Sequence, residues 1–176
     1  KLGGLNNDWD LTEFLLKKYG YEVDYRKIVD IFNAYYQELA PTEAPLITSE
    51  FFEKLSKDYN LAIFTGRVKE EAFFTLDKHN FTKFFYPIIT MKEVGFERQK
   101  PDCLGIEIIK EKIITDKIYY LGDTVDDMQC AMTANVNGIG VLPPQDKSEE
   151  LKNLLISKKA MVVLEQTTDL IKFLEG

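Results

Sequence analysis

The sequence predicts an α/β fold, in which a doubly wound and mostly parallel sheet is preceded by a small helical unit. From Thr48 onward, short apolar runs rich in β-favouring residues alternate with segments of helical periodicity, and this alternation is typical of parallel sheets covered by helices. Residues before about Pro45 show helical periodicity only. Because Ala40–Pro45 contains two prolines and no periodicity, we divide the chain there into residues 1–45 and residues 46–176.

Two helices are expected in the N-terminal part. Asp8 or Asp10 caps the first helix, which ends at Gly20, and Asp24 caps the second. Apolar residues at helical spacing are Leu11, Phe14 and Leu15 in the first helix, and Tyr25, Ile28, Val29, Phe32, Tyr35, Tyr36 and Leu39 in the second. These stripes predict that the two helices pack against each other, so we interpret the aromatic residues as the core of a helix pair.

The C-terminal part is expected to contain five strands, each a short apolar run. They are Leu61–Phe64, Ile88–Thr90, Ile118–Leu121, Gly138–Leu142 and Met161–Leu164. Helices are expected to begin at Thr48 or Ser49, near Glu70, at Lys100-Pro101, after Thr124, near Ser148 and near Asp169. Pro101 suits the first turn of its helix. His79, the only histidine, stands with Asn80 at the end of a helix and is interpreted as a terminal residue rather than a catalyst.

Composition narrows the class of protein. The chain has 176 residues, of which 45% are hydrophobic, which suits one globular domain with a small insert. A net charge of −7 and the lack of any Lys/Arg run argue against a nucleic acid or an anionic membrane as partner. No stretch approaches the ~18 consecutive apolar residues of a membrane span. Cys103 and Cys130 are expected in helices as reduced, buried thiols, which favours a cytoplasmic location.

The strongest functional signal follows the strand Ile118–Leu121. Gly122 breaks this strand, and Asp123, Asp126 and Asp127 crowd the start of the next helix, where the helix dipole favours negative charge. The apolar stripe of this helix is Val125, Met128 and Met132. In open α/β sheets, ligands bind beyond the carboxyl ends of strands, and carboxylates clustered there suit Mg²⁺. For this segment alone, an Asp N-cap with acidic residues on a solvated helix is an equal alternative.

Two further polar signals follow other expected elements. Thr65 ends a strand, and its hydroxyl forms a natural phosphate cradle with the backbone N–H groups of Gly66 and Arg67 at a helix N-terminus. Lys100 is expected at the start of another helix, where its ammonium can neutralise charge on a transferring phosphoryl group. Singly, these are a strand-ending Thr and a solvated Lys. Their order along the chain favours a joint phosphate and metal site.

Three segments together resemble the haloacid dehalogenase-like (HAD) superfamily. I-F-T-G-R, E-V-G-F-E-R-Q-K-P and Y-L-G-D-T-V-D-D-M-Q-C-A are similar to its motifs two, three and four. The following A-M-T-A-N-V-N-G-I-G-V resembles the family's passage from helix to strand, with Asn135 at a left-handed position where glycine is usual. The resemblance covers roughly Ile47–Val141 and implies a Rossmann-like core. It also implies that residues 1–45 belong to a small helical cap.

The resemblance implies a mechanism and assigns roles to residues. In this family an aspartate attacks phosphorus to form an aspartyl-phosphate, which water then hydrolyses, and a second aspartate serves as general acid and base. By similarity, Thr65 binds phosphate, Lys100 orients the nucleophile and screens charge, and Asp123 is a Mg²⁺ ligand. Asp127 supports either the metal or Lys100. Arg67 is no fixed part of the motif and is left as a substrate or surface residue.

The family's motif one is not apparent. Its nucleophile lies in D-x-D-x-T/V after a buried strand, and Asp8-Trp9-Asp10-Leu11-Thr12 matches those letters. The preceding Gly3-Gly4-Leu5-Asn6-Asn7 lacks the residues of a buried strand, so we interpret Asp8 and Asp10 as cap residues. In the family this strand lies between those of motifs two and four, and its absence would leave two parallel edges facing a trough. We therefore expect the complete protein to have a further N-terminal segment that carries the strand and the nucleophile.

The leading prediction is that the complete protein is a Mg²⁺-dependent phosphatase of a small phosphorylated metabolite. A dehalogenase fits less well because that chemistry does not need the acid pair, and a phosphosugar mutase is left open. From another class, the chain could be a catalytically inactive HAD-like binding or regulatory module. A phosphoacceptor receiver domain fits the order Thr65, Lys100, Asp123 less well. The oligomeric state stays open, although exposed sheet edges could drive dimerisation by strand exchange.

Overall fold

A computed structural model describes residues 8–176, so the segment Gly3–Asn7 discussed above lies outside the described residues. The strands are β1 (Leu61–Phe64), β2 (Phe85–Ile89), β3 (Tyr119–Gly122), β4 (Asn137–Val141) and β5 (Val162–Leu164). The α-helices are α1 (Asp8–Lys18), α2 (Tyr25–Leu39), α3 (Ser49–Leu55), α4 (Lys69–Lys78), α5 (Met91–Val94), α6 (Leu104–Lys112), α7 (Val125–Thr133), α8 (Glu149–Ser157) and α9 (Leu170–Glu175). Short 3-10 turns are η1 (Ala40–Thr42), η2 (Thr82–Phe84), η3 (Phe96–Arg98) and η4 (Thr167–Asp169). Within residues 8–176, no helix has the length and apolar character needed to cross a membrane.

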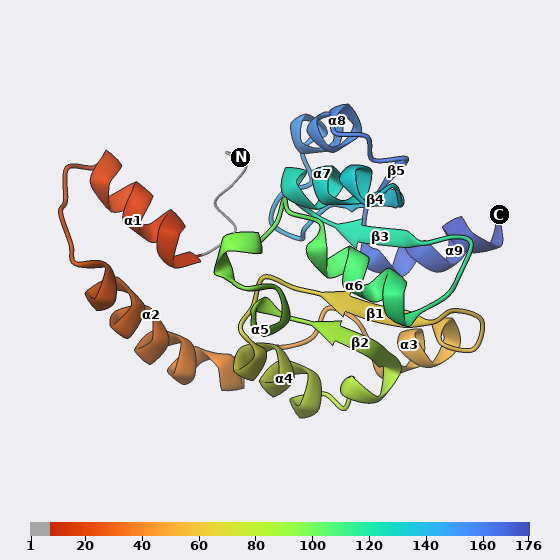
Figure 1. The fold of residues 1–176 in the computed structure, drawn as a ribbon, viewed down its shortest axis with the longest axis horizontal. Helices are drawn as coiled ribbons and strands as arrows, with labels where there is room; N and C mark the ends of the chain where they lie inside the picture. Colours follow the sequence, from red (N-terminus) through yellow and green to blue (C-terminus); the bar gives the residue numbers. More distant parts are fainter. Residues whose placement is uncertain (1–7) are drawn as a thin grey trace.

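The predicted α/β fold with parallel strands is confirmed. β1 pairs in parallel with β2, and β4 lies in parallel between β3 and β5. Among residues 8–176 no strand joins β1 to β3, so the strands form a two-stranded and a three-stranded sheet. In Figure 1 the two sheets lie one above the other, with α7 and α8 beside the larger sheet and α4 and α5 beside the smaller one.

An apolar groove separates β1 from β3. It has a volume of about 450 Å³ and is lined by both strands together with residues of α3 and α6. Each strand has its ladder partner on the side away from the groove, because β1 pairs with β2 and β3 pairs with β4. In the described part of the chain, the two edges that face the groove therefore present backbone N–H and C=O groups without a neighbouring strand.

The buried clusters connect the two sheets. One cluster contains Phe64 of β1, Ile106 of α6 and Cys130 of α7. A second cluster, around Ile139 of β4, also includes residues of α3. The close approach of α6 to β1 depends on Gly105, because a Cβ at this position would lie 2.3 Å from the Phe64 ring. This packing fixes the loop before α6 beside the carboxyl end of β1.

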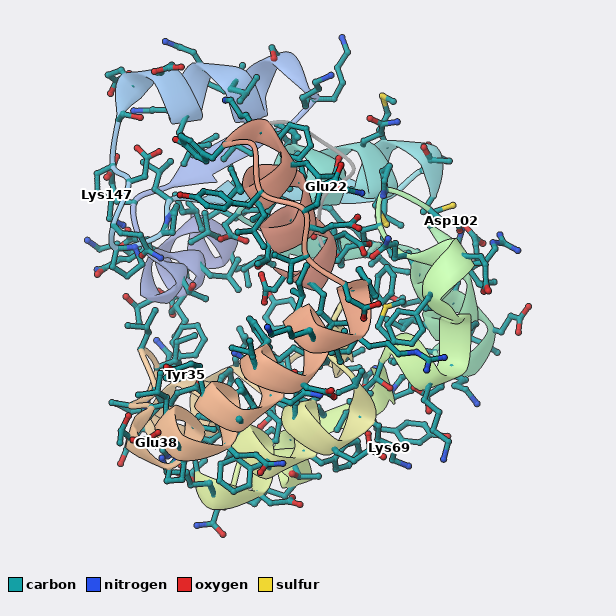
Figure 2. All side chains as sticks on the ribbon, turned by 90° about the vertical axis from the view of Figure 1, so that its left-hand side faces the viewer. Glu22, Tyr35, Glu38, Lys69, Asp102 and Lys147 are labelled. Atoms are coloured by element: carbon teal, nitrogen blue, oxygen red, sulfur yellow. The ribbon has the colours of Figure 1, made fainter. Side chains whose placement is uncertain are left out.

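The helices α1 and α2 form a pair at one side of the core (Figure 1). The Asp24 carboxylate accepts hydrogen bonds from the N–H groups of Arg26 and Lys27, which confirms it as the cap of α2. Burial is slight: α1 has no fully buried residue, and α2 has only Ile28. Figure 2 looks onto this pair, with Tyr35 towards the far end of α2 and Lys69 at the start of α4.

The linker between α2 and α3 is held against α4. The Nζ of Lys78 donates hydrogen bonds to the carbonyl oxygens of Pro41, at 2.6 Å, and Glu43, at 2.8 Å. Glu43 also accepts a hydrogen bond from the Thr75 hydroxyl, at 3.3 Å, through its side chain. Residues 40–45, which the sequence predicted as irregular, contain the single turn η1 and are fixed by these bonds.

Two predictions about the loop before α6 were wrong. The helix begins at Leu104 rather than at Lys100-Pro101, because the Asp102 carboxylate accepts the Leu104 N–H at 2.8 Å and starts the helix there. Lys100 therefore lies in a loop. Cys103 precedes the helix and is only partly buried, whereas Cys130 is fully buried in α7 as predicted.

Three further details differ from the sequence-based expectations. Gly122 does not break β3 but is its last residue, paired with Gly140. β2 begins at Phe85, earlier than expected. Met132 is 54% exposed, because the face of α7 that carries Met128 and Ala131 packs on the core, whereas the next residue, Met132, points outward.

The predicted left-handed position of Asn135 is confirmed, because its φ is 55°.

Candidate active site

The loop after β1 holds the predicted phosphate-binding residues. The Thr65 N–H donates to the Ile89 carbonyl oxygen at 3.0 Å, which extends the β1–β2 pairing to the last residue before the turn. The Thr65 hydroxyl accepts the Arg67 N–H at 3.2 Å, and Gly66 is exposed between them. Val68, the N-cap of α4, provides no side-chain hydrogen bond to the helix. The first N–H groups of α4 thus lack a side-chain cap, as at helix ends that receive anions.

Lys100 and Asp127 form a buried ion pair. Their Nζ and Oδ1 atoms lie 2.7 Å apart, and only 15% and 4% of the two side chains are exposed. The Lys100 ammonium also lies 5.5 Å from the centre of the Phe64 ring, at the end of β1. The lysine therefore connects the carboxyl end of β1, in the smaller sheet, with the first turn of α7, which follows β3 of the larger sheet.

The Asp127 carboxylate is saturated with hydrogen bonds from the protein. Oδ1 accepts from Lys100 and, at 3.1 Å, from the Tyr120 hydroxyl. Oδ2 accepts from the N–H and, at 2.7 Å, from the hydroxyl of Thr124, in a capping box at the start of α7. Gly122 makes room for this arrangement, because a Cβ there would lie 2.2 Å from the Cβ of Asp127.

The two acidic residues of this site have opposite pKa shifts. Burial opposes ionisation of Asp127, but the Lys100 ammonium and the hydrogen bonds from Lys100 and Thr124 outweigh it and lower the pKa of this carboxyl. Removal from water and the neighbouring Asp127 charge raise the pKa of Asp123, although Lys100 offsets part of that rise. Burial, and next the Asp127 charge, raise the pKa of Tyr120, so its hydroxyl stays a hydrogen-bond donor.

Asp123 has the donor type that a hard cation prefers. It follows β3 directly, and partial removal from water, followed by the neighbouring Asp127 charge, raises the pKa of its carboxyl. Asp127 already accepts hydrogen bonds from Lys100, Tyr120 and Thr124. This geometry favours the prediction that it supports Lys100 over the prediction that it supports the metal. Among residues 8–176 there is no group of three His, Cys, Asp or Glu side chains suited to a metal. One carboxylate, with water and phosphate completing the shell, suffices for Mg²⁺.

The structure thus joins Lys100, Asp123 and Asp127 in one electrostatic network. Thr65 and Gly66 line an adjoining pocket with Gln99, the residue before Lys100. Asp8 and Asp10 lie in the first turn of α1, and Asp10 accepts the Tyr25 hydroxyl at 2.6 Å. Asp8 nevertheless lines the Thr65 pocket from the cap side.

Sequence reasoning missed Tyr120 at the core site and Phe32 and Phe96 in the adjoining pocket. Tyr120 was read only as a core residue of β3, and no motif indicates that its hydroxyl reaches Asp127. Phe96 and the cap residues Trp9 and Phe32 line the Thr65 pocket. The only early signal was the excess of aromatic residues in the helical front part, which also fits simple packing.

A comparison with known families decides the relationship. The profile of haloacid dehalogenase-like hydrolases matches residues 6–141. The chain belongs to the haloacid dehalogenase-like hydrolase family. A comparison with curated protein sequences gives no match. The matched residues of this HAD protein include the helices α1 and α2 and extend to the end of β4.

Solved structures share the fold of this HAD protein at low sequence identity. A hydrolase from Pseudomonas syringae has a TM-score of 0.75 and 21% identity, with 97% of this chain and 79% of that chain covered. A candidate HAD-hydrolase from Bacillus subtilis bound to magnesium has a TM-score of 0.70 and 18% identity, over 99% and 74% of the two chains. A predicted phosphoglycolate phosphatase from Haemophilus somnus has a TM-score of 0.68 and 15% identity, over 94% and 74%.

Proposed function

We propose that the complete protein is a Mg²⁺-dependent phosphatase that hydrolyses a small phosphorylated metabolite through an aspartyl-phosphate. The observation that carries this proposal is the buried Lys100–Asp127 pair, which holds an ammonium between the carboxyl ends of β1 and β3. A cation fixed there by protein contacts costs no reorganisation when charge develops on a phosphoryl group. Family membership supports hydrolase chemistry of this kind.

Different residues of the chain would bind the phosphate and stabilise the charge of the transition state. The Thr65 hydroxyl and the N–H groups at the start of α4 would bind phosphate oxygens. Lys100, held by Asp127, would orient the attacking carboxylate and neutralise charge in the transition state. Tyr120 and Thr124 act through Asp127 and are positioning residues. Asp123 would hold Mg²⁺, which supplies Lewis-acid stabilisation of the phosphoryl oxygens when bound.

We place the nucleophile on a strand that fills the apolar groove between β1 and β3. The groove has a volume of about 450 Å³ and runs along two edges that could each add a parallel neighbour. A strand inserted there would end beside Thr65, Lys100 and Asp123, where an aspartate could attack phosphorus. The bond from phosphorus to the leaving oxygen then breaks, a second aspartate protonates that oxygen, and water later hydrolyses the acyl phosphate.

The second candidate is a non-catalytic HAD-like binding module. It is favoured by the placement of Asp8 and Asp10 on α1, because both carboxylates belong to the first turn of a helix. Turnover of p-nitrophenyl phosphate with and without Mg²⁺ separates the two functions. We expect the longer natural form to turn over and Asp123→Ala to reduce its rate at least about a hundredfold, as for loss of one transition-state donor.

The assignment of the nucleophile is tested on the chain Lys1–Gly176 itself. We expect it to bind inorganic phosphate but to show no Mg²⁺-dependent turnover. Full activity of this chain, abolished by Asp8→Asn, would place the nucleophile on α1 and overturn the proposal. Two free thiols, one of them fully buried, suit a reducing compartment, so we also propose a cytoplasmic location.

A further inference from the structure

The pocket beside Thr65 has a composition that the phosphate chemistry does not explain. It has a volume of about 170 Å³ and lies between the cap helices, the loop after β1 and η3. Pockets for drug-sized ligands have volumes of about 300–1,000 Å³, so this one suits only a small group. Because Thr65 and Gly66 are among its lining residues, a phosphate bound to them would place the rest of its ester in or beside this pocket.

Three aromatic rings from three elements line this pocket. Trp9 of α1 lies edge-on to Phe32 of α2, with ring centres 6.5 Å apart, and its centre is 6.2 Å from that of Phe96 in η3. Cap and core thus meet through Trp9. Such a wall offers π-faces to a cation, and this attraction is strongest for tryptophan.

Acidic side chains are in excess around the same pocket. Asp8 and Glu71 both line it. Burial raises the pKa of Glu71, while Asp8 and Glu43 add to the rise against the opposing effect of Arg67. Arg67 lines the pocket too, but its guanidinium lies 3.6 Å from the Glu43 carboxylate and donates to the Thr75 hydroxyl at 3.2 Å. Among the described residues that line the pocket, Arg67 is the one cation and pairs with the linker, whereas the two carboxylates Asp8 and Glu71 also line it.

We propose that this pocket selects a phosphate ester whose leaving group carries an ammonium-type cation, held between the aromatic wall of Trp9 and the carboxylates of Asp8 and Glu71. This inference rests on the proposed function for the orientation of the ester. An anionic leaving group would meet like charges, and a neutral one would gain no cation–π attraction. Glu71 and Trp9 are thus specificity-determining residues, contributed by the core and the cap.

Trp9 is the only tryptophan of the chain, so its fluorescence reports on this pocket directly. With the chain Lys1–Gly176 and Mg²⁺, we would titrate phosphocholine, glycerol 2-phosphate, phosphoglycolate and inorganic phosphate. We expect phosphocholine to bind at least about tenfold more tightly than phosphoglycolate, which corresponds to about 1.4 kcal/mol. Equal affinities, or a preference for phosphoglycolate, would overturn the inference and leave the phosphatase assignment intact.

Variants separate the pocket from the phosphate site. Glu71→Gln should weaken phosphocholine about threefold to tenfold and leave inorganic phosphate unchanged. Glu70→Gln removes the same charge from the exposed neighbour in α4 and should change neither ligand. Choline alone should shift the Trp9 fluorescence saturably, and Glu71→Gln should weaken the affinity for choline. Choline binding without any phosphate binding would refute the proposed function but support the pocket, whereas a loss of phosphocholine affinity as large in Glu70→Gln would refute the pocket.

Discussion

The core site and the cap pocket are adjacent but are built in opposite ways. At the core site, Asp127 is 96% covered and its oxygens accept four hydrogen bonds, so every donor around it has a fixed place. The side chains around the cap pocket are less buried: Phe96 is 48% exposed, and α1 contributes no fully buried side chain. At the core site Lys100 and Asp127 balance each other's charge, whereas we propose that the carboxylates of the pocket bind a cationic ligand group. In the proposed function, the rigid core site would keep the reacting groups in place, and the more open pocket would determine which substrate binds.

The largest expected effect is the loss of the buried acid. Asp127→Ala leaves the Lys100 ammonium, only 15% exposed, without its carboxylate, and we expect the free energy of unfolding to fall by about 3–5 kcal/mol. The matched change in the cap, Asp30→Ala on exposed α2, should stay within about 0.5 kcal/mol. Urea denaturation measures both. The double variant Asp127→Ala/Lys100→Met should recover part of the loss, and similar values for the two single variants would refute the comparison.

Glycine substitutions sharpen the comparison at the next level. Gly122→Ala places a Cβ against Asp127, and we expect overpacking to cost about 1–3 kcal/mol and to weaken phosphate binding. Gly20→Ala in the cap meets no atom within 4 Å but must adopt φ of 83°, which costs about 1–2 kcal/mol. The two variants should thus have similar thermal stability losses and differ in phosphate affinity. An unchanged affinity in Gly122→Ala would show that Asp127 can shift without consequence.

A smaller effect is expected for Tyr120→Phe. The variant removes one of the hydrogen bonds to Asp127 and keeps the ring contact with Phe64. We expect a loss of about 1 kcal/mol in stability, because the other donors keep the carboxylate ionised. In a form that carries the proposed strand and nucleophile, turnover should fall through kcat with KM nearly unchanged, since Tyr120 acts through Asp127 and Lys100. A rise in KM alone would contradict this positioning role.

The sequence predicted local features well and contacts between distant residues poorly. The β1 strand, the Asp24 cap and the acidic start of α7 are local signals, and the structure has them where they were expected. Tyr120 could not be assigned, because a buried tyrosine and a hydrogen-bonding one have the same sequence pattern. Proline suits a first turn and so predicts that Lys100 starts a helix. The Asp102 carboxylate instead accepts the Leu104 N–H and starts the helix there. Trp9 and Phe96 are far apart in the chain, and no periodicity connects them.

The smallest expected effect is a pH dependence of opposite sign in the two regions. The folded-state pKa of Asp127 is lowered, so its stabilisation is present above the unfolded value of about 3.9 and is lost as the pH falls through the folded value. The folded-state pKa of Glu71 is raised, so its ionisation destabilises the fold as the pH rises from about 4.3 through the folded value. Glu71→Gln should therefore unfold at slightly higher urea concentration than the parent at pH 7, and this gain should vanish at pH 4. Because an ammonium ligand would compensate the same charge, saturating choline should raise the parent's stability at pH 7 and remove the advantage of Glu71→Gln. A variant that is less stable than the parent at pH 7 would mean that Arg67 already satisfies Glu71, and the pocket would then be as closed electrostatically as the core.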